Sequence, residues 1–410
     1  MEQPTSSSPA SLPEDIVVDI LSRLPVASLC RCKCVCRRWR HLIVHPEHRR
    51  RLVQTLSGFF SHLSLDDDAA AVYPPPWRFT ASSALEPPHA VAVDTAFSFL
   101  PSSYLSNDTE LLDSCNGLLL LRCCRASSSS WSRHLVLASY VYVVCNPATE
   151  QWVELPAPRH APGAFGLRSD RLAGRRRTRT AALAFDPADA SSPARFHVLQ
   201  LVERETIYPS LLWPAHCFVV AAVEIYSSQT RSWDLADCSE WSDLPCTGQA
   251  AYHDGSLHFT TGDGAVLSVD TQAQEFRVTR VMPARSVFGG AGCFVGRSRG
   301  RLLYVHTGST SPSMSVYALE TRQGRRERWV IRHYADAVGQ FGKTLFKENY
   351  GVVAIHPDGN VIFLFDGSRG ILMAYDMGRR TVRDVQHLAG SSPYYPFFPY
   401  IPLYSSETLT

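Results

Sequence analysis

The chain has 410 residues, of which 45% are hydrophobic and 19% are charged, so it is long enough for two domains or for one large repeat fold. Its net charge of +2 is uneven, because residues 1–60 hold nine Lys/Arg against five Asp/Glu, whereas the remaining 350 hold 31 against 33. The larger part therefore lacks the basic surface that binding to nucleic acid or to an anionic membrane would require.

The first ten residues form a polar Ser/Pro tail, which we expect to be disordered, and they lack the features of a secretory signal. The longest uncharged apolar run, residues 135–145, is too short for a membrane helix. Twelve cysteines in such a chain predict reduced thiols and a cytoplasmic and/or nuclear location.

Residues 11–50 have the periodicity of short helices. Ser11 and Glu14 make a capping box at the start of the first helix. Apolar residues then recur every four positions, which predicts an apolar stripe on one face. Pro25 ends this helix, and a second helical run extends to Ile43. The stripe consists of Ile16, Ile20 and Leu24, with Val17 and Leu21 beside it.

The stretch CRCKCVCRRWR (30–40) raises the question of a metal or redox site. If the segment is one helix, Cys32 and Cys36 lie on its apolar side, whereas Cys30 and Cys34 lie on its polar side with the arginines. Cysteines split between two faces cannot surround one zinc ion, and we therefore predict no metal and no cofactor. Cys30 and Cys34 remain candidates for reactive thiols beside basic side chains.

About 40 residues of short helices with wide apolar faces cannot bury enough surface to be stable alone. Either a partner protein or a second copy of the chain must cover these faces.

The sequence SLPEDIVVDILSRLPVASLCRCKCVCRRWRHLI (11–43) resembles an F-box. The resemblance implies three short helices that bind the Skp adaptor of a Skp–cullin–F-box ubiquitin ligase and, through it, the cullin and RING subunits. Ser28 departs from the family, which often has an acidic residue there, and F-boxes also break the helix near Val35. The residues expected to bind the adaptor are Leu12, Pro13, Ile16, Ile20, Leu21, Leu24, Pro25, Leu29, Val35 and Trp39.

Residues 51–90, which include DDDAAA and YPPPW, are predicted to be a linker. Between residues 91 and 404, short apolar runs are separated by Gly, Asn, Asp and Pro, and this pattern predicts an all-β domain.

Two units recur in this β domain at the spacing expected for four-stranded propeller blades. We therefore predict a β-propeller, with six blades favoured, in which the sixth blade is completed by a strand at 91–100 and by C-terminal residues. In the second unit, the first residue of the turn precedes an aromatic or branched residue by six. The first unit is a turn followed by a strand and occurs as CNGLLLL (115–121), HDGSLHF (253–259), SRGRLLYV (298–305) and PDGNVIFL (357–364). The second occurs as VVCNPATEQWVEL (143–155), VEIYSSQTRSWDL (223–235), VLSVDTQAQEFRV (266–278) and LMAYDMGRRTVRDV (372–385), with a longer version at 316–331.

The phrases at 113–156 and 350–377 are similar to the plant-type, kelch-like propeller region that follows F-boxes. This resemblance implies recognition of a target protein, whose identity the sequence does not specify.

Other conspicuous segments have two interpretations each. The arginine cluster GRRRTR (174–179) is either a solvated loop or a nuclear-import or acidic-partner segment. The aromatic tail PYYPFFPYIPLY (393–404) either packs on the propeller and closes its ring or forms a peptide-binding surface. The His-Asp-Gly and His-Pro-Asp-Gly phrases are explained by turn chemistry.

The leading hypothesis is a non-catalytic substrate receptor of a cullin-type ubiquitin ligase that binds the Skp adaptor and an unknown target protein, and neither nucleic acid nor a membrane. One alternative is a scaffold, or a protein that senses a small ligand in the propeller centre, that keeps the adaptor contact without degradation. Another is a propeller enzyme, for example a glycoside-acting one, which would need a pair of acids that the sequence does not show.

Overall fold

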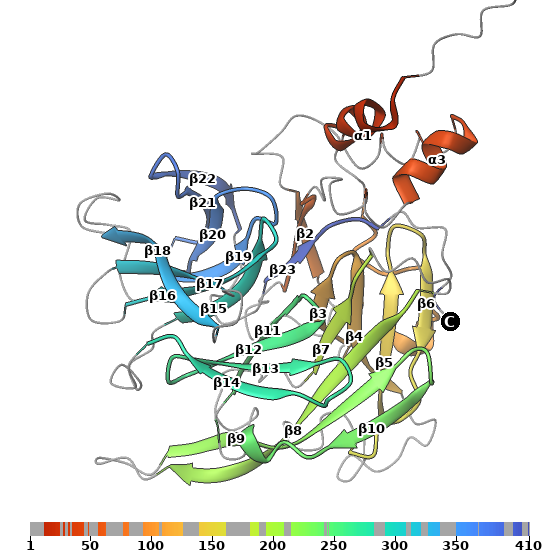
Figure 1. Ribbon diagram of the computed structural model, residues 1–410. Coiled ribbons are helices and arrows are strands. Elements are labelled where there is room, and N and C mark those ends of the chain that lie inside the picture. The colour runs from red at the N-terminus through yellow and green to blue at the C-terminus, as the bar shows by residue number, and fades with distance from the viewer. Residues whose placement is uncertain are drawn as a thin grey trace, which may run out of the picture.

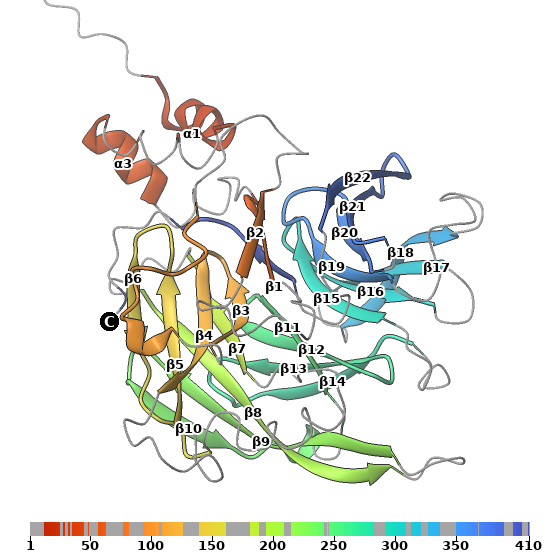
Figure 2. The ribbon, with the colours of Figure 1, turned by 180° about the vertical axis from the view of Figure 1, so that it is seen from behind.

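Within the described residues, the computed structural model places two α-helices, two one-turn 3-10 helices and six β-sheets, and neighbouring sheets contact each other through their innermost strands (Figures 1 and 2). The predicted fold class, a small helical segment followed by a six-bladed β-propeller, is confirmed. The described residues are 12–24, 28, 32, 35–44, 48, 56–62, 77–81, 93–105, 109–125, 139–160, 181–187, 194–208, 215–241, 244, 246–282, 292–308, 313–320, 327–336, 350–367, 369–388, 397–403 and 409.

The helical segment is a pair of helices, α1 (Glu14–Ser22) and α3 (Arg37–Val44). Pro13 precedes α1 with φ of −54°, and two acidic residues in the first turn complement the positive end of the helix dipole. Arg38 joins the helices, since its Nη2 donates to the carbonyl oxygen of Leu12 at 2.7 Å. Between the helices lies a small core of Val17, Val18, Leu21, Leu42 and Ile43.

The second helical run is not one continuous helix to Ile43, although the assignment of the cysteines to two faces assumed that it was. Ser28 and Cys32 have helical backbone, but Val35 lies in a turn and Cys36 lies outside any helix. A new helix then begins, because the Cys36 sulfur accepts the backbone N–H of Trp39 at 3.4 Å and so caps α3. The rest of the predicted second helix lies outside the described residues.

Each blade is an antiparallel sheet whose first strand lies near the ring centre. Blades 1 to 5 have four strands, and the described part of blade 6 has three. Blade 1 comprises β3 (Glu110–Cys115), β4 (Leu118–Arg125), β5 (Ser139–Asn146) and β6 (Gln151–Glu154). Blade 2 comprises β7 (Ala181–Phe185), β8 (Phe196–Tyr208), β9 (Ala215–Ser227) and β10 (Ser232–Ala236). Blade 3 comprises β11 (Cys246–His253), β12 (Ser256–Thr261), β13 (Ala265–Asp270) and β14 (Phe276–Arg280).

Blades 4 to 6 complete the ring, with one-turn helices at η1 (Ser102–Tyr104) and η2 (Ser239–Trp241) in the connections before blades 1 and 3. Blade 4 comprises β15 (Gly292–Ser298), β16 (Arg301–Thr307), β17 (Ser313–Glu320) and β18 (Arg328–Asp336). Blade 5 comprises β19 (Tyr350–Ile355), β20 (Val361–Asp366), β21 (Ile371–Asp376) and β22 (Thr381–His387). Blade 6 comprises β23 (Phe397–Tyr400), β1 (Gly58–His62) and β2 (Trp77–Ala81), in order from the centre outward.

The first predicted unit is the hairpin between the two inner strands of a blade. In blades 1 and 3, Asn116-Gly117 and Asp254-Gly255 have positive φ at both positions, as a tight type I′ hairpin requires. The second unit is the hairpin between the two outer strands, and its aromatic residue pairs with the residue just before the turn, as Trp152 does with Cys145. Both predicted units are therefore confirmed as hairpins.

Burial falls from the centre of each blade to its edge. All five residues of β7 are buried, and residues 118–121 of β4 are fully enclosed. The outermost strands β14 and β22 have no buried residue. This gradient follows from the ring, because inner strands are covered by neighbouring blades on both faces, whereas outer strands meet solvent.

Strands from both ends of the described chain close the ring. β23 pairs antiparallel with β1, which pairs with β2 (β23 and β2 are labelled in Figure 1, β1 and β2 in Figure 2). Of the two interpretations of the aromatic tail, the described residues of the tail support ring closure, since Phe397, Phe398 and Tyr400 are buried there. Residues 93–100 contain turns, so the predicted strand at 91–100 is wrong for its described part.

The predicted linker over 51–90 is wrong at β1 and β2, which are both part of blade 6. Their sequences, GFFSH and WRFTA, are short apolar strands flanked by the acidic and proline-rich stretches that indicated a linker. They become stable strands because β23 supplies the hydrogen-bonding partner that local sequence cannot reveal.

Candidate functional site

One face of α1 exposes an apolar stripe. Ile16 and Ile20 are 48% and 45% exposed, and their spacing of four places them along one side of the helix. Leu12, which is 52% exposed, lies two residues before α1. Val35, which is 64% exposed, lies in the turn before α3. We call these four residues the α1 stripe. They are half of the eight large hydrophobic side chains that the described residues expose, so the stripe is a candidate protein-binding surface.

The other expected adaptor-binding residues lie elsewhere. Leu21 is only 1% exposed and packs inside the two-helix core, so it cannot contact a partner in this arrangement. Leu24 and Trp39 are half-buried against the same core, and Pro13 is exposed beside the stripe. Pro25 and Leu29 lie outside the described residues.

The cysteines of this segment have separate structural roles. Cys32 is half-buried against the two-helix core, in keeping with its predicted apolar side. Cys36 was expected to lie among apolar side chains, but it is exposed and caps α3, because the helix is broken there. Cys30 and Cys34 lie outside the described residues.

A cavity of about 130 Å³ lies at the ring centre, lined by the inner strands of blades 1, 3, 4, 5 and 6. This volume is well below the roughly 300–1,000 Å³ that is usual for a small-molecule site. The wall of this cavity contains the buried acid Asp113. Oδ2 of Asp113 accepts a hydrogen bond from the backbone N–H of Leu183 at 2.8 Å. Burial and then the Asp113 charge raise the pKa of the Cys115 thiol to about 12, so Cys115 is a poor nucleophile. The centre therefore serves packing better than chemistry.

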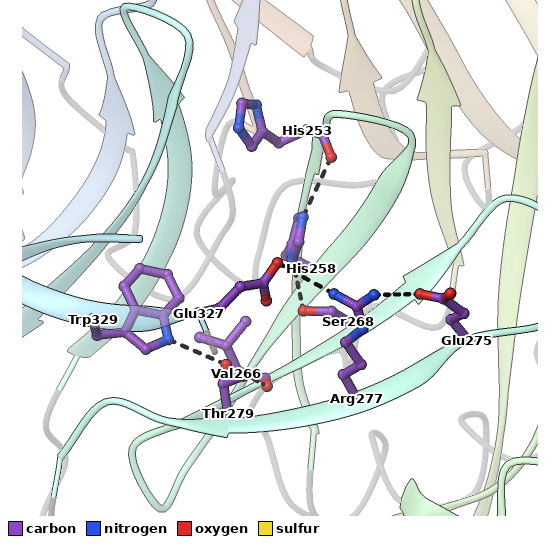
Figure 3. A network of polar contacts seen from close by, with 9 residues as sticks. All are labelled: His253, His258, Val266, Ser268, Glu275, Arg277, Thr279, Glu327 and Trp329. Carbon is purple, nitrogen blue, oxygen red and sulfur yellow. Dashed lines mark hydrogen bonds and ion pairs between the residues drawn. The ribbon is translucent and has the colours of Figure 1, made fainter. Parts of the chain in front are cut away.

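A groove of about 310 Å³ lies between blades 3 and 4, and we call it the acidic groove. Its lining includes Asp254, Glu275 and Glu327, with Arg277 as the basic residue. Figure 3 shows Arg277 of β14 between Glu275, which lies just before this strand, and Glu327 of blade 4, with an Nη1–Oε1 distance of 3.2 Å to Glu327. Arg277 thus links the two blades, and it forms an ion-pair triad with Glu275 and Glu327.

Two histidines line the acidic groove (Figure 3). His258 Nδ1 lies 2.7 Å from Ser268 Oγ, and burial lowers the pKa of His258 to about 4. Burial also lowers the pKa of His253, against the opposing effect of Asp254. Both imidazoles are therefore neutral at neutral pH, as expected for histidines with a structural role.

A larger groove of about 410 Å³ lies between blades 4 and 5, and we call it the basic groove. Arg299, Arg301 and Arg332 line it together with His333, and among its described lining residues none is acidic. In each blade, the turn between the two inner strands and the turn between the two outer strands lie at the same end. Both grooves open at this end of the blades.

Sequence reasoning missed two buried acids in blade 2. Glu224 is fully buried and accepts from His160, whose Nδ1 lies 2.7 Å from Glu224 Oε1. Gln200 Nε2 donates to the His160 carbonyl oxygen at 2.8 Å, so His160 is fixed where the chain leaves blade 1. Glu203 is also buried, and its Oε1 has no hydrogen-bond partner within the part of the chain that the structure describes. Only the positions of Glu203 and Glu224 in apolar strands could have revealed their burial.

Within the described part of the chain, no helix is long and apolar enough to cross a membrane. Among the same residues, no cluster of three or more His, Cys, Asp or Glu is placed to hold a metal ion. The cysteines described there have free thiols.

Comparison with known proteins identifies both parts of the chain. Residues 9–55 match the F-box-like family, and residues 99–378 match the KIB1-4 beta-propeller family. The chain is 26% identical over 356 residues to F-box protein At5g07610 of Arabidopsis thaliana, which covers 79% of this chain and 70% of that protein. It is 29% identical over 155 residues to F-box protein At5g49610 of the same plant, covering 37% and 35% of the two chains. A third relative, F-box protein At3g07870 of A. thaliana, is 58% identical over 33 residues, or 8% of each chain.

Proposed function

Because the chain belongs to the KIB1-4 β-propeller family and carries an F-box-like domain, we propose that it is the substrate-recognition subunit of a Skp–cullin–F-box ubiquitin ligase. In this role the helical segment binds a Skp-type adaptor, and the adaptor links the chain to the cullin and RING subunits. The propeller holds a target protein near a charged ubiquitin-conjugating enzyme, which raises the effective concentration of the target's lysines. A cytoplasmic and/or nuclear location would suit this role.

The observation that carries the proposal is the α1 stripe. A protein normally buries such side chains, yet Ile16 and Ile20 are exposed on a helix whose opposite face is packed, and Leu12 is exposed just before that helix. The resemblance of residues 11–43 to an F-box implies that the same three residues contact the adaptor. Leu21 then acts indirectly, since it holds α1 on α3 and so positions the stripe.

We propose further that the chain itself is not an enzyme, as is general for F-box proteins. Two acids of the acidic groove, Glu275 and Glu327, are both paired with Arg277 and are not poised as an acid and a base. His258 is neutral and buried, and the pKa of Cys115 is too high for a nucleophile at neutral pH.

The experiment is co-precipitation of the full chain with a Skp-type adaptor. The double variant Ile16→Arg and Ile20→Arg places charges in the stripe without touching the two-helix core, and it should abolish capture. The double variant Leu235→Arg and Val278→Arg is the matched control, because it adds two arginines at exposed hydrophobic positions of the outer propeller strands β10 and β14. Retained capture by the double variant of Ile16 and Ile20 would count against the stripe as the adaptor surface.

The scaffold alternative keeps the adaptor contact and differs only in the fate of the partner. Proteins captured by proximity labelling with the full chain should have longer half-lives when the chain is depleted, if it is a substrate receptor. Unchanged half-lives would favour the scaffold.

A further inference from the structure

The basic groove between blades 4 and 5 is shaped by an irregularity in β18. Val316 of β17 pairs with His333, but the next residue, Tyr317, pairs with Ile331, so Arg332 is an extra residue in the ladder. In a regular strand, consecutive side chains alternate between faces, whereas a β-bulge places neighbouring side chains on one side. The bulge thereby allows Arg332 and His333 to line the same groove.

Two arginines of this groove have no acidic partner among the described residues. Arg301 is exposed, and its guanidinium makes neither an ion pair nor a hydrogen bond there. Arg299 uses its Nε to donate to the carbonyl oxygen of Asp358 at 3.0 Å, which fixes the side chain without neutralising it. Only Arg332 is compensated, by Glu320.

The acidic groove provides a contrast within the same molecule. It lies in the equivalent position one blade earlier, and its three acids face a single arginine. The two grooves therefore have opposite charge, which is not expected if interblade grooves merely followed the near-neutral composition of the propeller. The positive charge of the basic groove is a local feature.

The basic groove also has an apolar floor. Leu303, Val316 and Met377 contribute aliphatic side chains to its lining. Apolar surface enclosed by charged groups is typical of a peptide-binding surface.

We propose that the basic groove binds an acidic peptide segment of the target protein, with an apolar side chain on the groove floor and an adjacent Asp or Glu carboxylate on Arg299 and Arg301. The inference rests on the proposed role of the propeller in holding a target. A carboxylate suits the site because a guanidinium binds it with paired N–H donors, and two uncompensated guanidinium groups border one groove.

The position of the groove fits the proposed assembly. Ser57, just before β1, donates its backbone N–H to the Tyr400 carbonyl oxygen at 3.0 Å, at the end of the inner strand of blade 6. Inner strands end at the inner hairpins, where the basic groove opens. The chain thus leads toward the helical segment from the same end of the blades that would hold the acidic peptide.

The test uses the full chain, captured through its Skp-type adaptor and presented to a displayed library of random short peptides. The wild-type chain should enrich peptides in which Asp or Glu neighbours an apolar residue, and Arg301→Glu should lose this enrichment. Arg195→Glu is the matched control, because Arg195 is an exposed arginine in the inner hairpin of blade 2. For a selected peptide, Arg301→Glu should weaken binding about tenfold or more, and added salt should weaken wild-type binding.

The inference is overturned if wild type and Arg301→Glu select the same peptides, or if acidic residues are not enriched. Thermal unfolding of each variant shows that the chain remains folded, as is expected for substitutions of exposed side chains. Capture by the adaptor is measured on the same preparations. If the chain is captured but does not enrich acidic peptides, only the inference about the basic groove is refuted. If the chain is not captured, the proposed function is refuted.

Discussion

Phe60 of β1 and Phe398 of β23 are register partners in the antiparallel ladder that closes the propeller. Phe60 is fully buried, and its ring lies 5.4 Å from that of Tyr400 and 5.1 Å from that of Phe79. The two strands are far apart in the sequence, so their ladder forms only when the C-terminal segment reaches β1. Ring closure is therefore a long-range contact that ties the segment after the helices to the C-terminal segment.

Replacement of Phe398 by Ala should lower the free energy of unfolding by about 3–5 kcal/mol, because it leaves a cavity at this closure. Tyr334→Ala is the control, since it removes an exposed aromatic side chain and should change stability by less than about 0.5 kcal/mol. Denaturant unfolding of the full chain measures both. Equal stabilities of the two variants would mean that blade 6 does not hold the ring together.

Two neighbouring residues of α1 should separate binding from folding. Ile20 is 45% exposed and Leu21 is buried. Ile20→Ala should leave the helical segment folded and weaken adaptor binding by about 1–2 kcal/mol, as for a residue in an interface. Leu21→Ala should destabilise the helix pair by about 2–5 kcal/mol and affect binding only through this loss. Titration with the adaptor and circular dichroism distinguish the two, and loss of helix in Ile20→Ala would refute the assignment.

Two hairpin glycines should differ in their tolerance of a side chain. Gly117 and Gly255 both have positive φ, of 97° and 77°, so Ala at either position costs about 1–2 kcal/mol of backbone strain. A Cβ on Gly117 would also lie 2.4 Å from the Cβ of Leu403, whereas one on Gly255 would meet nothing within 4 Å. Gly117→Ala should therefore destabilise the chain clearly more than Gly255→Ala in thermal unfolding. Equal losses would show that the segment at Leu403 does not pack on the blade 1 hairpin.

The hairpins of the propeller could be predicted from the sequence because each depends on adjacent residues. Asn116-Gly117 specifies its turn locally, and the repeat of this signal along the chain revealed the blades. β1 and β2 could not be predicted in the same way, because their strand character depends on β23, which is distant in sequence.

The candidate surfaces show the same division. The spacing of Ile16 and Ile20 predicted an apolar stripe, and the structure exposes it. The periodicity could not tell that Leu21 faces inward, because that depends on where α3 packs, nor that Cys36 caps a new helix. The bulge at Arg332 left no signal, since it is defined by a shift in pairing between two strands. Residues whose role depends on tertiary pairing are those that sequence reasoning missed.

Glu203 should make the stability of the propeller depend on pH. Burial raises the pKa of this carboxyl from 4.5 to about 7, so the folded chain binds more protons than the unfolded chain between these values. The free energy of unfolding must then fall as the pH rises through this window, and above pH 7 the full penalty of about 3 kcal/mol is present. Glu203→Gln removes the titrating group and should be more stable than wild type at pH 8, with little difference near pH 4.

The pH dependence of stability also contains a contribution from His258, whose sign is opposite to that of Glu203. Its lowered pKa means that the unfolded chain binds more protons between about pH 4 and 6.5, so its contribution falls as the pH falls. Both proteins contain His258, and its effect cancels in the difference between Glu203→Gln and wild type. Glu240→Gln, at an exposed glutamate, controls for the loss of one charge. Denaturant unfolding between pH 4 and 8 should give a stability difference that grows with pH only for Glu203→Gln, and a flat difference would mean that Glu203 is hydrated in the folded protein.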